Sequence, residues 1–256
     1  GGDSALERLP AETAHAKLPQ RVLCPNSDMP THLLLAALTT AARTPTPPLW
    51  GGARRWASFA INLTSHEMSA SARPWLFNYY YDSDVNASLW QHLEGQRDWV
   101  CSRGSPNLTA AGVPCDALHA TDGWLYIRFP QRGRCCRCTD DPSLGFVKSD
   151  WLRQPETRYM GTELVDGVQA DHWLLDANFT SSDNHYYSTP DAAARPVRFM
   201  EHEDGTNLKM WDFELAAYVP GGEFPAELLA PPAAGTCDEA CEVLATPGGY
   251  PGCTYR

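Results

Sequence analysis

Apolar and polar residues alternate one by one in five stretches of the chain beyond residue 50. These stretches span residues 56–61, 75–82, 124–129, 197–200 and 210–217. Strict alternation sends the apolar side chains of a strand to one face of a sheet and the polar ones to the other, which is typical of antiparallel sheets. The 19 Gly and 21 Pro residues punctuate these runs. The pattern predicts a mainly β fold (β-rich α+β): two antiparallel sheets curved around an apolar core or pocket, with short helices and Cys-rich flanks.

The two ends of the chain lack this alternation and divide it into three parts. Residues 1–49 are predicted to be an N-terminal extension that ends in the stiff Pro-rich run Thr44–Pro48. One main β domain is predicted over residues 50–237, with one or two helical turns over residues 223–229. Residues 238–256 are predicted to be an irregular Cys/Gly/Pro-rich tail.

Charge and hydropathy exclude two classes of partner. The formal net charge is −11, from 20 basic and 31 acidic residues, whereas binding to a phosphate backbone needs a positive surface. We therefore expect no nucleic-acid partner. No apolar run approaches the roughly 20 residues that a membrane-spanning helix needs, so we also expect no transmembrane anchor.

Four Asn-X-Ser/Thr triplets and nine cysteines point to the secretory pathway. Chance would give about one such triplet for this content of Asn, Ser and Thr. The features together predict a secreted, extracellular, disulfide-bonded glycoprotein. An odd number of cysteines leaves at least one of them free or bonded to another chain. The predicted glycan acceptors are Asn62, Asn86, Asn107 and Asn178, and the candidates for disulfide bonds are Cys24, Cys101, Cys115, Cys135, Cys136, Cys138, Cys237, Cys241 and Cys253.

The run Cys135-Cys136-Arg137-Cys138 allows two interpretations. A thiolate cluster with Cys101 or Cys115 would bind a metal ion. Structural zinc sites, however, space their ligands as Cys-x2–4-Cys in two knuckles, and no second knuckle follows this run. Separate disulfides that converge on one strand end are the preferred interpretation, because the other signals indicate an oxidising compartment.

Calcium binding has weak support in the residues themselves. The run Asp82-Ser-Asp84-Val-Asn86 matches the start of an EF-hand loop, but Ala87 and Leu93 stand where that loop needs Gly and a bidentate Glu. A polar turn is therefore predicted there. Acidic loops at residues 140–141 and 201–204 remain open as weak Ca²⁺ sites or as plain solvated loops.

No catalytic signature occurs in the chain. The Gly-x-Ser-x-Gly elbow, the His-Glu-x-x-His metal site and the P-loop are all missing from the sequence. A triad assembled in space from distant residues would leave no such trace. We predict a protein that is not an enzyme and that requires no cofactor.

Short motifs occur in a fixed order between Trp50 and Cys237. They are Phe77-Asn-Tyr-Tyr-Tyr-Asp82, Tyr159-Met-Gly-Thr-Glu163, Asp171-His-Trp173, Tyr186-Tyr-Ser-Thr189, Arg195-Pro-Val-Arg-Phe199, Trp211-Asp-Phe213, Gly221-Gly222, Phe224 and Pro231-Pro232 to Cys237. In this order they resemble the motifs of the ependymin-related proteins, a family of secreted glycoproteins. The nine cysteines exceed the family's usual small disulfide set.

The resemblance implies two antiparallel sheets around a deep apolar pocket, akin to bacterial lipoprotein carriers. It also implies a hydrophobic or lipid ligand, Ca²⁺ binding and dimers. The predicted function is binding of such a ligand between two sheets, modulated by Ca²⁺. The residues expected to line the pocket are the inward sets of the alternating strands: Phe77, Tyr79, Leu125, Ile127, Phe129, Val197, Phe199, Phe213 and Leu215.

A structural role is the alternative function. The N-terminal extension, the Cys-rich tail and the odd cysteine would tie copies of the chain into an extracellular matrix or filament. Arms that flank a compact domain suit assembly by exchange between neighbours.

Overall fold

A computed structural model describes most of the predicted β domain. The described residues are 44–52, 58–67, 74–93, 101, 113–138, 147–176, 183–203, 206–221, 224–237 and 239–241. Cys24, Cys253, Asn107, Asn178 and the acidic pair at residues 140–141 lie outside them.

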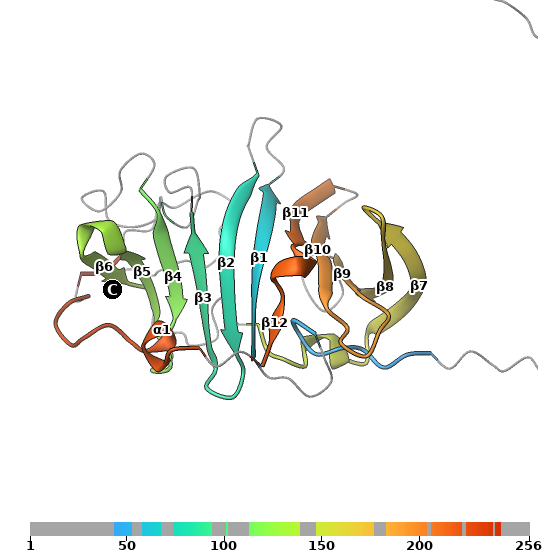
Figure 1. Cartoon of the computed structure of the whole chain (residues 1–256), viewed down its shortest axis with the longest axis horizontal. Helices are drawn as coiled ribbons and strands as arrows, with labels where there is room; N and C mark the ends of the chain where they lie inside the picture. Colours follow the sequence, from blue (N-terminus) through green and yellow to red (C-terminus); the bar gives the residue numbers. More distant parts are fainter. Residues whose placement is uncertain are drawn as a thin grey trace, which may run out of the picture. The chain divides into compact units, whose positions relative to one another are not determined.

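The described strands form one sheet in which every neighbouring pair is antiparallel (Figure 1). The strand order is β6-β5-β4-β3-β2-β1-β11-β10-β9-β8-β7, and the short β12 also pairs with β1. The strands are β1 (Ser58–Glu67), β2 (Trp75–Asp82), β3 (Ala87–His92), β4 (Cys115–His119), β5 (Leu125–Phe129), β6 (Arg134–Arg137), β7 (Thr157–Val165), β8 (Val168–Leu175), β9 (Asp183–Ser188), β10 (Pro196–Glu203), β11 (Thr206–Phe213) and β12 (Val219–Pro220). The short helices are η3 (Pro130–Arg132), η4 (Trp151–Arg153), η5 (Leu215–Ala217) and α1 (Ala226–Leu229).

The prediction of a mainly β, antiparallel fold is confirmed, and the number of sheets differs. Strands β1–β6 form one meander and β7–β11 form another, and the two meanders join where β1 pairs with β11 from Leu63↔Phe213 to Glu67↔Lys209. The result is one continuous hydrogen-bonded sheet. Alternation could not distinguish one sheet from two, because it reports which side chains are buried and not which strand lies alongside.

The alternation at residues 210–217 predicted one long strand, and its second half is wrong. The chain leaves the sheet at Glu214, whose N–H donates to the carbonyl of Asn62 at 2.9 Å. It then turns through η5 and returns to β1 as β12, where Val219 pairs with Ala60. The last four residues of the predicted strand, 214–217, therefore do not pair in the sheet, and the chain reaches the other end of β1.

The C-terminal segment covers one face and the free edge of the β1–β6 meander. Leu229 of α1 is buried in a cluster with Leu89, Leu118 and Tyr126, on the face of β3–β5 opposite Ile127. Further on, Arg137 of β6 bonds to Glu239 and Cys241 through backbone atoms at 2.9 and 3.1 Å. An exposed edge strand invites pairing with other chains, and this segment blocks the β6 edge.

Disulfides hold that segment from both sides of the strand. Cys135 bonds to Cys237 and Cys136 bonds to Cys241, while Cys101 bonds to Cys115. Adjacent residues of a strand point to opposite faces, so the first two bonds clamp β6 between them. Cys138 is also disulfide-bonded. The disulfide interpretation of the Cys135–Cys138 run is confirmed.

The two bonds of this clamp should contribute to stability in a strongly non-additive way. They span 102 and 105 residues, and closing such a loop is worth about 5 kcal/mol. Once one bond is present, the other closes a loop of a few residues, worth about 2 kcal/mol. We expect Cys136→Ala/Cys241→Ala to lower the free energy of unfolding by about 2 kcal/mol and removal of both pairs to lower it by about 7 kcal/mol.

Urea denaturation of the two double variants and the quadruple variant measures these costs. The Cys135→Ala/Cys237→Ala variant is the matched control, and its free energy of unfolding should fall by about 2 kcal/mol, as in Cys136→Ala/Cys241→Ala. A quadruple variant that loses merely the sum of the two smaller costs would contradict the shared-loop explanation.

Candidate functional site

Five neighbouring strands place an aromatic side chain at the same level on one face of the sheet. The register pairs Tyr159 with Trp173, Trp173 with Tyr186, Tyr186 with Phe199, and Phe199 with Trp211. Ring centroids lie 5.0 Å apart for Tyr159–Trp173 and 4.8 Å apart for Phe199–Trp211. Cross-strand aromatic pairs at these distances stabilise a sheet. We call these five residues the aromatic row and the face that carries them the inner face.

The inner face of the other meander continues this aromatic surface. Ser65 of β1 lies opposite Trp211, and it also lies opposite Trp75 of β2. Because Ser65 is small, Trp211 reaches across it to Trp90 of β3, at 4.9 Å between ring centroids. Trp90 in turn lies 4.2 Å from Tyr79. The aromatic surface therefore runs from β7 to β3 without interruption.

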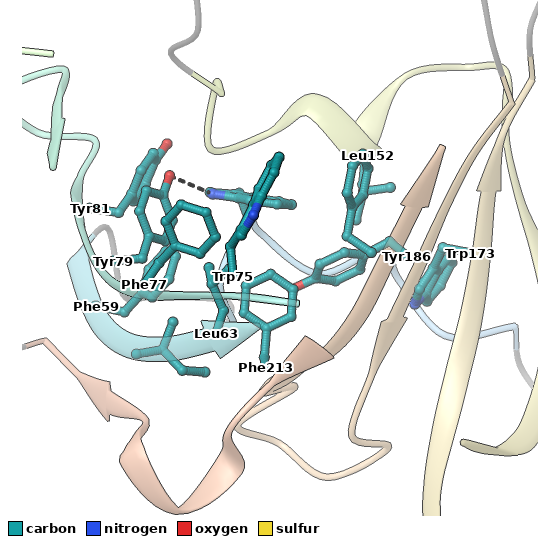
Figure 2. Packing of buried hydrophobic residues seen from close by; sticks show 13 residues of the cluster. Phe59, Leu63, Trp75, Phe77, Tyr79, Tyr81, Leu152, Trp173, Tyr186 and Phe213 are labelled. Atoms are coloured by element: carbon teal, nitrogen blue, oxygen red, sulfur yellow. Dashed lines mark hydrogen bonds between the residues drawn. The ribbon is translucent and has the colours of Figure 1, made fainter. Parts of the chain in front are cut away.

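Two connecting segments, not a second sheet, cover this surface. Trp50 lies against Tyr186, Phe199 and Phe213 at 5.6, 5.9 and 6.2 Å between ring centroids. Its indole N–H donates to the hydroxyl of Tyr79 at 3.2 Å, drawn as the dashed line in Figure 2. The backbone N–H of Trp50 donates to the carbonyl of Ser149 at 2.7 Å, which joins the first covering segment, residues 44–52, to the second, residues 147–153.

The turn after Trp50 explains why glycine follows it. Gly51 has a φ of +75°, a conformation that residues with a side chain rarely adopt. A Cβ atom at Gly51 would also overlap the ring of Phe59. The close approach of this turn to Phe59 keeps the Trp50 ring centred on the aromatic surface.

The second covering segment adds η4. Figure 2 shows Leu152 of η4 above Tyr186 and Trp173. Trp151 contacts Trp50, Tyr186 and Phe199 with ring centroids 5.7 to 6.2 Å apart. The segment is tied to the sheet by Tyr81, whose hydroxyl donates to the carbonyl of Val147 at 2.7 Å.

Two indole donors inside the cluster have no partner among the described residues. They are Nε1 of Trp151 and Nε1 of Trp173, and each atom is shielded from solvent. Leaving a buried donor unpaired costs about 1–3 kcal/mol. A bound group with a hydrogen-bond acceptor would remove that cost.

Three buried tyrosines and one buried histidine of the inner face are uncharged. Burial raises the pKa of Tyr79, Tyr81 and Tyr186 well above the ordinary value, so their hydroxyls stay protonated. Burial also lowers the pKa of His92 to about 3, so its imidazole, 4.4 Å from the ring of Phe77, is neutral at physiological pH. The surface can therefore bind apolar groups and hydrogen-bond acceptors.

The structure divides the nine predicted pocket residues among three clusters. Four of them lie together on the inner face beside the aromatic row: Phe77, Tyr79, Phe199 and Phe213. Ile127, Phe129 and the partly buried Leu125 pack instead with disulfide sulfurs. Val197 and Leu215 lie in a third cluster, with Tyr187 and Ala170.

Sequence reasoning missed the residues at the centre of the site. Trp50 and Trp151 lie in connecting segments, where no strand alternation could mark them. Trp173, Tyr186 and Trp211 do stand inside the family-like motifs. That position is the one sequence signal that could have added them to the candidate set.

The structure also places the candidate calcium and glycan residues. Residues 82–86 form the β2–β3 turn, with the N–H of Asp84 donating to Oδ1 of Asp82 at 2.9 Å, so the polar-turn prediction is confirmed. Glu201 and His202 lie in strand β10 and not in the expected loop. Asn62 and Asn86 are both exposed. Within the described residues, no group of three or more His, Cys, Asp or Glu is arranged to hold a metal ion.

Comparisons with known proteins find distant structural likenesses. No family model and no curated protein sequence matches the chain. A conserved protein of Thermus thermophilus has a TM-score of 0.46 at 11% identity over 72% of this chain and 91% of its own. Lipoprotein LppX of Mycobacterium tuberculosis has a TM-score of 0.36 at 8% identity, over 67% of this chain and 90% of its own. A LolA superfamily protein of Nitrosomonas europaea has a TM-score of 0.33 at 10% identity, over 70% of this chain and 92% of its own. None of these likenesses assigns a function to the chain. Separately, no helix in the described part of the chain is long and apolar enough to cross a membrane.

Trp50 should be the side chain on which closure of the inner face depends. We expect Trp50→Ala to lower the free energy of unfolding by about 3–5 kcal/mol, because it leaves a cavity between five aromatic rings. Tyr79→Phe removes the hydrogen bond to Trp50 and keeps the ring, so it should cost about 1 kcal/mol. Urea denaturation measures both. Equal costs for the two variants would show that Trp50 does not fill the centre of the cluster.

Proposed function

We propose that the protein binds a hydrophobic or lipid ligand on the inner face of its sheet. The proposal rests on the way in which the aromatic surface is covered. The continuous aromatic surface from β7 to β3 is closed by side chains of two connecting segments, residues 44–52 and 147–153. Connecting segments shift more readily than a packed sheet, so a ligand would take the place of Trp50 while the sheet keeps its pairing.

The exposed parts of this surface suggest where a ligand would make first contact. Trp90, Trp151, Trp211 and Tyr159 are partly exposed, whereas the rings between them are buried. Ligand sites are commonly apolar and aromatic with a few placed polar groups. The unpaired indole donors of Trp151 and Trp173 would serve as those polar groups, so an amphipathic ligand with a carboxyl or ester oxygen fits better than a plain hydrocarbon.

We also propose that the protein is secreted and ependymin-related. The disulfides of the described residues support an oxidising compartment. The family-like motifs support the relationship, because they contribute every member of the aromatic row. Modulation by Ca²⁺, self-association and a matrix or filament role stay predictions of the sequence.

Ligand affinity should depend on the aromatic row and not on the disulfide-rich cluster. Trp211→Ala removes a partly exposed ring that contacts Trp90 and Phe199, and it should weaken binding of a fluorescent fatty acid about tenfold. Phe129→Ala is the matched control. It deletes a buried aromatic ring from the separate cluster around Cys136, so it should lower stability and leave affinity unchanged.

Fluorescence titration of folded wild type and both variants measures these affinities. Saturable uptake by the wild type is required. A wild type that takes up no fatty acid would contradict the assignment of the inner face as the binding surface. Equal loss of fatty-acid affinity in the two variants would contradict it as well.

Secretion should be visible as glycosylation at the two described acceptors. Asn86 has a φ of 51° in the β2–β3 turn, a conformation that glycine tolerates well. Asn86→Gly should therefore remove one glycan without loss of stability, and Asn62→Gln should remove a second. Intact mass of protein secreted from eukaryotic cells, with and without enzymatic deglycosylation, checks both. Identical masses before and after the enzyme treatment would contradict the prediction.

A further inference from the structure

Three histidines lie side by side on the face opposite the aromatic row. His172 belongs to β8, His185 to β9 and His202 to β10. Nε2 of His172 lies 2.8 Å from Nδ1 of His185, and the ring centroid of His202 lies 4.7 Å from that of His185. We call these three residues the histidine row.

The hydrogen bonds of the histidine row determine which ring nitrogens carry a proton. Oε1 of Glu163 lies 2.7 Å from Nδ1 of His172, so a carboxylate there accepts a proton from that nitrogen. A neutral His172 then presents a bare Nε2, which accepts the Nδ1–H of His185. The relay Glu163–His172–His185 is complete with both imidazoles neutral.

One extra proton can be accommodated, and two cannot. A single added proton leaves one N–H between the two rings, shared by Nε2 of His172 and Nδ1 of His185. A second added proton places an N–H on each of these nitrogens. Two N–H groups that face each other at 2.8 Å repel, so the side-chain contact between His172 and His185 breaks.

Burial and the charges around the histidine row set the pH range in which the two histidines become protonated. Burial lowers the pKa of both His172 and His185, and Glu163 and Asp183 oppose this effect only in part. Repulsion from His172 and His202 adds to the effect of burial, and the pKa of His185 falls to about 4. Tyr187, stacked on His172 at 4.4 Å, is neutral. The other described charges on this face are paired: Arg158 with Asp176, and Arg198 with Asp166 and Asp212.

Acid weakens the folded arrangement of His172 and His185. A histidine whose pKa in the folded chain lies below its ordinary value of 6.5 binds its proton more readily once its surroundings loosen. The folded arrangement is therefore fully favoured above about pH 6.5 and loses free energy as the pH falls toward 4.

The histidine row is coupled to the inner face through the backbone. His172 precedes Trp173, and His185 precedes Tyr186, and the same β8–β9 register pairs Trp173 with Tyr186. Tyr186 in turn supports Trp50, at 5.6 Å. Separation of β8 from β9 on the histidine side would therefore loosen the aromatic row under its cover.

We propose that the histidine row is an acid-operated latch: double protonation of the His172–His185 pair parts β8 from β9 and opens the aromatic inner face. Opening exposes tryptophan rings whether or not a ligand is present. Release of a hydrophobic ligand in acid would be the consequence, and that step alone rests on the proposed function.

The test follows tertiary structure from pH 7.5 to 4 in the full chain without ligand. Near-ultraviolet circular dichroism and binding of an apolar dye report opening, and far-ultraviolet circular dichroism reports the sheet. The wild type should lose aromatic signal between about pH 6.5 and 4 while the sheet signal persists. The variant His172→Gln/His185→Gln keeps hydrogen-bonding groups without the titration, and its midpoint should fall by about one pH unit.

His66→Gln is the matched control, because His66 lies on the same face, 3.1 Å from Asp212 and outside the row, and its midpoint should match the wild type. An unshifted midpoint in the folded double variant overturns the latch. Should that variant fail to fold at pH 7.5, NMR titration of the wild-type imidazoles decides. Two coupled steps support the latch, and independent titrations near pH 6.5 overturn it.

A fluorescent fatty acid separates this proposal from the proposed function. Opening in acid with no fatty acid bound at any pH would support the latch and contradict lipid binding. Fatty acid that stays bound down to pH 4 without opening would support lipid binding and contradict the latch.

Discussion

Pairing of β1 with β11 is the contact on which the whole sheet depends. It connects two meanders that are otherwise local in sequence, and it aligns Leu63 with Phe213 so that both inner faces become one surface. Its position also sets the aromatic contacts across the seam, because Ser65 then lies between Trp211 and Trp75. A shift of one residue in this register would turn the aromatic side chains of one meander to the opposite face.

A single sheet with an aromatic face creates a problem that the rest of the chain resolves. One face cannot bury itself, and an uncovered aromatic surface of this extent would drive aggregation. On the inner face, Trp50 and η4 provide the cover. On the opposite face of β3–β5, α1 and the disulfide-held C-terminal segment provide it. The first cover is held by packing and hydrogen bonds, and the second is held by covalent bonds. This difference is the reason for placing the proposed opening on the inner face.

Alternation assigned β2 and β5 correctly, because the side chains it predicted to point inward lie together in one cluster for each strand. In β10 it grouped Val197 with Phe199, but the register shifts between Pro196 and Arg198 and the two side chains lie in separate clusters. Alternation failed to predict the structure where the choice of strand partner determined the path of the chain. Residues 214–217 alternate as well as their neighbours do, yet the chain turns there to reach β12. Long-range partners were also invisible: nothing local to Trp50 indicates that Phe213 packs on it, and spacing alone could not assign Cys136 to Cys241. Separate clusters for Phe129 and Phe213 follow from strand order, which a single sequence does not reveal.

The two faces of β8 and β9 share one register. In a strand, each residue that points inward is bonded to one that points outward, so a histidine relay on one face shares its backbone with an aromatic pair on the other. The sequence spacing of His172, His185 and His202 has no period, because cross-strand neighbours are separated by the lengths of hairpins. Their chemistry emerges when the register places them together. The same register that builds the aromatic row therefore also builds the titratable contact behind it, and the proposed latch uses this shared backbone to couple the charge of one face to the packing of the other.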